Sequence, residues 1–161
     1  MIDKKEWIPF MWGVVSENEE IVRKMLKTFD ISHHEKENKA AATPLHIVTG
    51  KGRQARTLDV MISNLGFDKM AKDILDRTVL HVAAYCGFVA CVHKLIDHGV
   101  EINVSDKDEK IPLHPACSRG KEDVVHLLAN SGATINRYSW GNETTRLNYA
   151  VGNNNTEIIQ F

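Results

Sequence analysis

A four-residue pattern that recurs along this chain constrains its fold more than any other feature. Thr-Pro-Leu-His at residues 43–46 returns as Thr-Val-Leu-His at 78–81, as Ile-Pro-Leu-His at 111–114 and, more weakly, as Thr-Arg-Leu-Asn at 145–148. The leucines of these copies are Leu45, Leu80, Leu113 and Leu147, so the spacing between copies is nearly constant. A period of this length is typical of arrays in which one small structural unit is stacked on the next.

A second pattern repeats in the same phase. Gly99 opens the segment Gly-Val-Glu-Ile-Asn, and Gly132 opens Gly-Ala-Thr-Ile-Asn one period later. Between the two patterns, apolar residues recur at i, i+3 and i+4, which predicts one buried face of a helix in each unit. These apolar sets are Ile21, Val22, Met25, Leu26; Leu58, Met61, Ile62, Leu65; Val89, Val92, Leu95, Ile96; and Val124, Val125, Leu127, Leu128.

The local chemistry of each unit predicts two short helices. Thr78 is a suitable N-cap, and Pro44 suits the first helical position because its missing N–H would have no partner there. Gly87 and Gly120 are placed to end the first helix and turn the chain. The polar stretch 103–110 between units is predicted to be an extended loop or a hairpin.

The period, the Thr-Pro-Leu-His opening and the Gly-x-x-Ile-Asn close together resemble the ankyrin repeat family. The resemblance implies an all-α solenoid of stacked helix-turn-helix units with loop or β-hairpin fingers, because one unit cannot bury both faces of two short helices alone. We divide the chain, as a single array, into units at about 7–42, 43–77, 78–110, 111–144 and 145–161, the first and last of them degenerate.

Composition narrows the classes of partner. The chain has 20 basic and 21 acidic residues and a net charge of −1, so we expect no nucleic-acid partner. It has no apolar run of membrane-spanning length, and residues 1–6 are charged, unlike a signal peptide, so we expect no membrane partner. Three cysteines are too few for a disulfide scaffold. We therefore expect a cytoplasmic protein, with the nucleus as the alternative, that is monomeric when alone.

We predict no catalytic residue, no cofactor and no metal site. His46, His81 and His114 occupy one repeated position, so they lie one stacking step apart and do not converge on a metal ion. The resemblance implies that each hydrogen-bonds the loop of a neighbouring unit. Asn103 is expected to brace a loop, although the resemblance also allows its hydroxylation. The cysteines have no Cys-x-x-Cys spacing and are expected to be buried thiols.

The resemblance implies that the finger tips and the exposed face of the first helices line a concave groove for partner proteins. Trp, Tyr and Arg are enriched at binding hot spots, which draws attention to residues 137–140. Alternatively, Trp140 folds back onto the last unit as part of its cap. The predicted partner-binding residues are Trp140, Tyr138, Arg137, Lys107, Asp108, Asp106, Arg119, Tyr85, Lys72 and Ile74.

The resulting prediction is a non-catalytic module that binds a partner protein through this groove and its fingers. One alternative is an inhibitor of Rel-type transcription factors, similar to short ankyrin-repeat inhibitors that include viral ones. A second alternative is a regulatory or targeting segment of a longer enzyme or channel. The first alternative rests on resemblance to the family alone. The second is motivated by the fifth unit, which is expected to reach Phe161 midway through its second helix.

Overall fold

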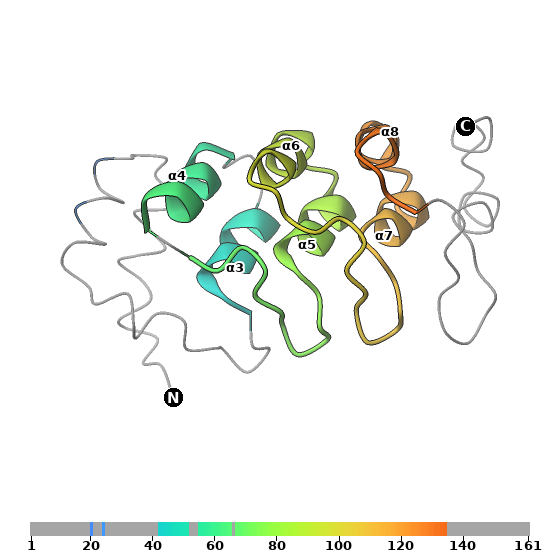
Figure 1. Ribbon diagram of the computed structural model, residues 1–161, viewed down its shortest axis with the longest axis horizontal. Coiled ribbons are helices and arrows are strands. Elements are labelled where there is room, and N and C mark those ends of the chain that lie inside the picture. The colour runs from blue at the N-terminus through green and yellow to red at the C-terminus, as the bar shows by residue number, and fades with distance from the viewer. Residues whose placement is uncertain (1–19, 21–23, 25–41, 52–54, 66, 135–161) are drawn as a thin grey trace.

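The computed structural model describes residues 20, 24, 42–51, 55–65 and 67–134, and within them it contains helices joined by loops, with no strand. The helices are α3 (Pro44–Lys51), α4 (Ala55–Leu65), α5 (Val79–Cys86), α6 (Val89–Asp97), α7 (Leu113–Ser118) and α8 (Glu122–Asn130). They form three successive pairs that fall within the second, third and fourth predicted units (Figure 1). The first and fifth predicted units lie outside the described residues, apart from residues 20 and 24.

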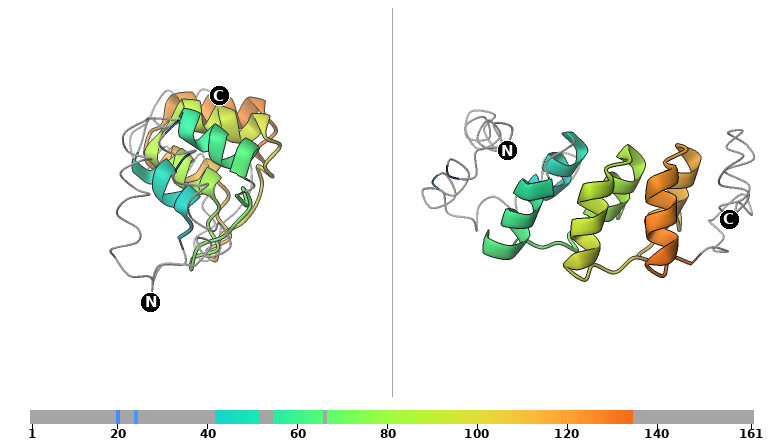
Figure 2. Two further views of the ribbon diagram at one scale, coloured as in Figure 1. Left: turned by 90° about the vertical axis from the view of Figure 1, so that its left-hand side faces the viewer. Right: turned by 90° about the horizontal axis from the view of Figure 1, so that it is seen from above.

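The helices stack in two layers. The first helices of the units, α3, α5 and α7, contact one another in sequence, and so do the second helices α4, α6 and α8. Figure 2 shows the same parallel stacking from the side and from above. The loops that join one unit to the next extend beyond the first-helix layer on one side of the array (Figure 1). The predicted all-α solenoid is confirmed, and its described fingers are loops and not β-hairpins.

The repeated leucines occupy equivalent interior positions. Leu45, Leu80 and Leu113 lie in α3, α5 and α7 and are each at most 1% exposed. They belong to one continuous apolar core that runs through all three units. The phase assigned from the sequence is therefore correct for these three copies, whereas Leu147 lies outside the described residues.

Where the structure describes their side chains, which excludes Leu65, the second helices bury the face that their periodicity predicts, with one exception. Leu58, Leu95 and Leu128 are fully buried, and Ile96 packs partly buried against the same core. Val89 was predicted to be buried, but this prediction is wrong because the side chain is 38% exposed. Val89 is the first residue of α6, and it lines a surface cavity together with Gly87 and Lys121, whereas Cys91 and Val92 in the same turn are buried in the core.

Helix ends follow the predicted chemistry. Thr78 is the N-cap of α5, and its backbone N–H donates to Nδ1 of His81 over 3.1 Å. Gly87 ends α5 in the left-handed region with φ of 81°, where a glycine carries no Cβ penalty. A Cβ at Gly87 would also lie 2.6 Å from Cδ of Lys121, so the lysine stem closes over this glycine from the next unit.

Thr49 gives a prediction about stability. Its side chain is 1% exposed in α3, and its hydroxyl has no hydrogen-bond partner among the residues that the structure describes. Valine keeps the shape of threonine and removes the unsatisfied hydroxyl. We expect Thr49→Val to raise the free energy of unfolding by about 1–3 kcal/mol, measured by urea denaturation. Thr57→Val, at a buried threonine with no such unsatisfied atom, is the control and is expected not to stabilise the protein. Equal or lower stability of Thr49→Val would contradict the prediction.

Candidate functional site

The first helices leave one stripe of side chains outside the core. In α5 every residue is buried except Val82, Tyr85 and Cys86, which are spaced i, i+3 and i+4. The equivalent residues of the next unit are the half-buried Pro115 and Ser118 of α7, followed by Arg119 just after the helix. Because residues at this spacing share one face of a helix, the two sets form matching stripes on neighbouring helices.

The stripe continues onto α3. Ile47 is half-buried and Gly50 is exposed, at the positions that correspond to Val82 and Tyr85. A Cβ at Gly50 would lie 3.5 Å from Cγ1 of Val82, which shows how closely these two helices approach. We call this surface the first-helix stripe. It consists of Ile47, Gly50, Val82, Tyr85, Cys86, Pro115, Ser118 and Arg119.

A contact between units fixes two side chains of the stripe. The guanidinium of Arg119 lies over the ring of Tyr85, 4.2 Å from its centroid, and also donates a hydrogen bond to the Tyr85 hydroxyl. Both side chains are exposed, and Tyr85 keeps 45% of its surface open to solvent. A cation held over an aromatic face is stabilised and restricted in its motion. Tyr85 and Arg119, predicted separately for partner binding, thus form one unit on the surface.

The two described fingers are built on one repeated aspartate. Oδ1 of Asp73 accepts the backbone N–H of Leu75 over 2.9 Å and that of Arg77 over 3.0 Å. At the equivalent position of the next unit, Oδ1 of Asp106 accepts the backbone N–H of Asp108 over 2.9 Å and that of Lys110 over 2.8 Å. We call residues 72–77 and 106–110 the finger loops. Their shape is set by internal hydrogen bonds before any partner arrives.

Asp73 is also neutralised within its own loop. Its Oδ2 accepts hydrogen bonds from Nε and from one NH2 group of Arg77, over 2.8 and 2.6 Å. Burial alone raises the pKa of Asp73, but the hydrogen bonds from Arg77 and Leu75 outweigh burial, so its pKa lies below the ordinary value. Asp73 therefore supports the loop as a carboxylate and does not present its charge to a partner.

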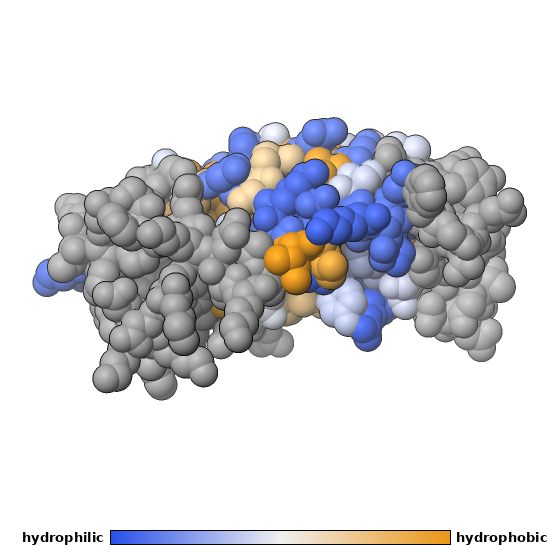
Figure 3. Space-filling view, turned by 90° about the horizontal axis from the view of Figure 1, so that it is seen from below, coloured by the Kyte–Doolittle hydropathy of each residue, from blue (hydrophilic) through white to orange (hydrophobic). Residues whose placement is uncertain are grey.

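The loops join side by side and expose an apolar tip. The backbone N–H of Lys107 donates to the carbonyl of Leu75 over 3.0 Å, which places the second described finger against the first. Ile74 and Leu75 are 47% and 46% exposed, and adjacent exposed aliphatic side chains are a common feature of interaction surfaces. Figure 3 shows an apolar patch on this side of the molecule, with hydrophilic residues directly beside it.

Both finger loops contain a residue in the left-handed region. Asp76 has φ of 57° and Glu109 has φ of 58°, and no other non-glycine residue in the described part of the chain has positive φ. An L-residue with a Cβ is strained there, whereas glycine is not. The two fingers therefore lose some stability at equivalent positions of successive units.

This strain predicts the effect of glycine at these positions. Glu109→Gly is expected to raise the free energy of unfolding by about 0.5–1 kcal/mol, because glycine adopts positive φ without a Cβ penalty. Lys107→Gly in the same loop, where φ is not positive, should instead lower stability through the entropy of the unfolded chain. Urea denaturation of both variants measures the difference. A loss of stability in both would contradict the assigned loop conformation.

Each repeated histidine is hydrogen-bonded to the last residue of its own unit, so the implied hydrogen bond to the loop of a neighbouring unit is wrong for the unit bounds given above. Nε2 of His46 lies 2.9 Å from the carbonyl of Arg77, and Nε2 of His81 lies 2.9 Å from the carbonyl of Lys110. Because a carbonyl only accepts, Nε2 carries the hydrogen and Nδ1 of His81 accepts from Thr78. Burial lowers the pKa of both histidines, and the hydrogen bonds to the carbonyls offset only part of this effect.

Asn103 connects the closing loops of two units. Its Nδ2 donates to the carbonyl of Gly132 over 3.0 Å, and its Oδ1 accepts the backbone N–H of Thr134 over 2.8 Å. The expectation of a bracing role is confirmed. Within the described residues, no three His, Cys, Asp or Glu side chains are placed to hold a metal ion.

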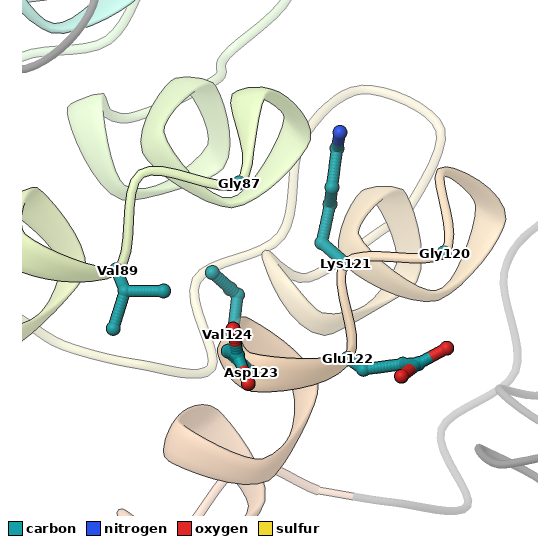
Figure 4. A pocket seen from close by; sticks show the side chains of 7 residues that line it. All are labelled: Gly87, Val89, Gly120, Lys121, Glu122, Asp123 and Val124. Carbon is teal, nitrogen blue, oxygen red and sulfur yellow. The ribbon is translucent and has the colours of Figure 1, made fainter.

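A cavity of about 270 Å³ lies between the helix-to-helix turns of the third and fourth units. Figure 4 shows Lys121 extending along the turn at Gly87, while Glu122 points away from Val89. The residues that line the cavity are Gly87, Val89, Gly120, Lys121, Glu122, Asp123 and Val124. One cation beside two carboxylates gives this cavity no clear preference for a charged ligand.

The predicted partner-binding residues fall into three groups: those on the first-helix stripe, those in or next to the finger loops, and those outside the described residues. Tyr85 and Arg119 touch each other, and Ile74 lies in the finger loop that Lys107 contacts. Lys72 and Lys107 are exposed, whereas Asp106 shapes its loop and Asp108 pairs with Lys110 over 3.0 Å. Arg137, Tyr138 and Trp140 lie outside the described residues.

The site prediction missed several residues of this surface. Leu75 is as exposed as Ile74, and Val82 belongs to the stripe although its apolar side chain suggests core. The signal that reveals Val82 is its i, i+3 spacing to Tyr85. The recurrence of aspartate at equivalent positions, Asp73 and Asp106, was a comparable signal for the loop-shaping residues.

None of the helices in the described ranges combines the length and apolar character needed to cross a membrane. The chain matches the family described as ankyrin repeats (3 copies) over residues 10–106, 45–139 and 80–161. It is 27% identical to the B-cell lymphoma 3 protein homolog of Mus musculus over 99% of this chain and 37% of that protein.

Two further relatives are much longer than this chain. It is 36% identical to the E3 ubiquitin-protein ligase KEG of Arabidopsis thaliana over 52% of this chain and 5% of the ligase. It is also 36% identical to the Transient receptor potential cation channel subfamily A member 1 homolog of Caenorhabditis elegans, over 58% of this chain and 7% of the channel. The chain thus spans well under half the length of each of these relatives. On the match across its length, and on the stacked helix pairs, this chain belongs to the ankyrin repeat family.

Proposed function

We propose that this chain is a non-catalytic module that holds a partner protein on the first-helix stripe and the finger loops. Ankyrin repeats are, in general, protein-interaction modules. One observation carries the proposal for this chain. A continuous core fixes the helices, yet Ile74, Leu75 and Tyr85 remain exposed on the stripe and loops. Exposed apolar side chains on a rigid support are typical of interaction surfaces.

The polar groups of the loops support the same proposal. Asp73 and Asp106 hold their loops in one conformation through hydrogen bonds to backbone N–H groups. A surface that is already ordered loses little entropy when a partner binds. We further propose that the chain acts in the cytoplasm, a reducing compartment in which its three free cysteines would stay reduced.

A second candidate function has its own observation. The chain resembles short stretches of a ubiquitin-protein ligase and of a cation channel, which supports a role as a regulatory or targeting segment in a longer protein. The same surface would then hold a substrate, a partner or another part of that protein. The prediction that the partner is a Rel-type transcription factor rests on the family resemblance alone.

Photo-crosslinking tests the proposal. A photoreactive amino acid is placed at Leu75 or Tyr85 in the proposed surface, and at Ala90 or Asn130 on exposed positions of α6 and α8 as controls. Crosslinking is carried out in cells of the source organism. We expect the same discrete protein at Leu75 and Tyr85, and not at the controls. Adducts at the controls alone, or the same pattern at all positions, would contradict the proposal.

A further inference from the structure

The first-helix stripe is apolar along one row and cationic at Arg119, which limits the kind of partner segment that fits it. The row nearest the finger loops contains the aliphatic or ring side chains of Ile47, Val82 and Pro115, all half-buried. The stripe contains no acidic residue, and Arg119 is its single charged residue. A segment that lies on this stripe therefore contacts the apolar row of Ile47, Val82 and Pro115 and, farther from the finger loops, the cation of Arg119.

Arg119 is prepared to receive an anion. Its guanidinium is held by the Tyr85 ring and hydroxyl, and no carboxylate in the described part of the chain pairs with it. The guanidinium has five N–H donors in a planar fork, and a single tyrosine hydroxyl leaves most of them open. The Arg119 side chain is exposed, and it is already restrained. Binding of a carboxylate therefore costs little conformational entropy of the arginine.

The finger loops add a second open cation beside their apolar tip. The carboxylates of Asp73, Asp106 and Asp108 are used within the loops, by backbone N–H groups and by Arg77 or Lys110. Lys107 is exposed, and its backbone touches Leu75. Among the residues that the structure describes, none pairs with the Lys107 ammonium group.

Three further charged groups belong to the finger loops. Lys72 is a third exposed cation, with no ion-pair partner among the described residues. Asp76 and Glu109 hold the left-handed positions of the loops, and their carboxylates form no ion pair within the described ranges. Because carboxylates repel one another, the anionic end of a bound segment is expected over Arg119 and Lys107, and not over Asp76 or Glu109.

We infer that the partner contributes an extended acidic segment, in which aliphatic or aromatic side chains contact Ile74, Leu75 and the apolar row, and Asp or Glu carboxylates pair with Lys107 and Arg119. This inference rests on the proposed function, because it names the chemistry of the partner for the same surface. Charge-assisted hydrogen bonds to an arginine fork add direction and selectivity to contacts that are otherwise apolar.

A displayed library of random dodecapeptides tests the inference without knowledge of the natural partner. The library is selected on the whole chain, and the enriched peptides are synthesised for affinity measurements. We expect enrichment of Asp and Glu together with Leu, Ile, Phe or Trp. We also expect the double variant Lys107→Gln, Arg119→Gln to bind these peptides roughly tenfold more weakly.

A charge-matched variant provides the control. Ser63→Glu together with Ala90→Glu lowers the net charge by the same amount on exposed positions of α4 and α6. It is expected to leave the affinity for the selected peptides unchanged. Equal losses in the two double variants, selected peptides without acidic enrichment, or a library that yields no binder would each overturn the inference.

Two more variants separate failure of the inference from failure of the proposed function. Leu75→Ser and Tyr85→Ala change exposed side chains of the surface and keep both Lys107 and Arg119, although Tyr85→Ala also removes the ring and hydroxyl that hold the Arg119 guanidinium. If they weaken binding of peptides that are not acidic, the surface is correct and the acidic partner is wrong. If neither weakens binding of acidic peptides, the binding surface itself is wrong, and both proposals fall.

Discussion

Leu113→Ala is expected to lower the free energy of unfolding by about 2–5 kcal/mol, which is the range for truncation of a fully buried leucine. Leu113 is 1% exposed and belongs to the core that α7 shares with its neighbours α5 and α8. The substitution removes apolar contacts and leaves a cavity that rigid stacked helices fill only in part. Because each unit is stabilised by its neighbours, the loss also weakens the third unit. Urea denaturation followed by circular dichroism measures the effect.

Leu75→Ala is the matched control, since it makes the same chemical change on an exposed finger tip. We expect its effect on the free energy of unfolding to stay within about 0.5 kcal/mol, as for most surface substitutions. Similar small effects for both leucines would contradict the burial of Leu113 and the phase of the repeat.

Acidification is expected to destabilise the array through His46 and His81. Burial lowers the pKa of both in the folded protein, so between the folded and unfolded pKa values the unfolded chain binds more protons. Their contribution to stability is therefore complete above the unfolded value of about 6.5 and is lost as the pH falls below it. The slope reaches at most about 1.4 kcal/mol per pH unit for each histidine.

The free energy of unfolding measured between about pH 7.5 and about pH 5 gives this slope directly. His81→Asn removes the titrating ring and should reduce the slope by as much as one proton, while it also lowers stability at neutral pH through loss of the bond to Lys110. An unchanged slope in His81→Asn would show that the imidazole does not titrate as its buried, Nε2-protonated state requires.

The architecture was predictable from sequence because the information is periodic. Leu45, Leu80 and Leu113 occupy the same buried position in three successive units. Each copy therefore supports the prediction that the other two are buried. Val89 shows the limit of this argument. Periodicity assigns a residue to a helix face, but it does not show that the first residue of that helix lines a surface cavity while Cys91 and Val92 in the same turn are buried.

The surface was predictable only in part, because it depends on contacts between units. Tyr85 and Arg119 belong to different units, and nothing in either local sequence indicates that one stacks on the other. Val82 is apolar and was not distinguished from core, although it lies on the exposed side of α5. The left-handed conformation of Asp76 and Glu109 was equally hidden, because the residue type that most strongly signals such a conformation is glycine.

Hydrogen–deuterium exchange with and without a bound partner tests the central claim most directly. The measurement uses the whole chain and the protein captured by crosslinking at Leu75. We predict slower exchange on binding in residues 72–86 and 105–119, which contain the finger loops with α5 and α7, and unchanged exchange in α6 and α8. Slower exchange in α6 and α8, with no change over the finger loops, α5 and α7, would contradict this prediction.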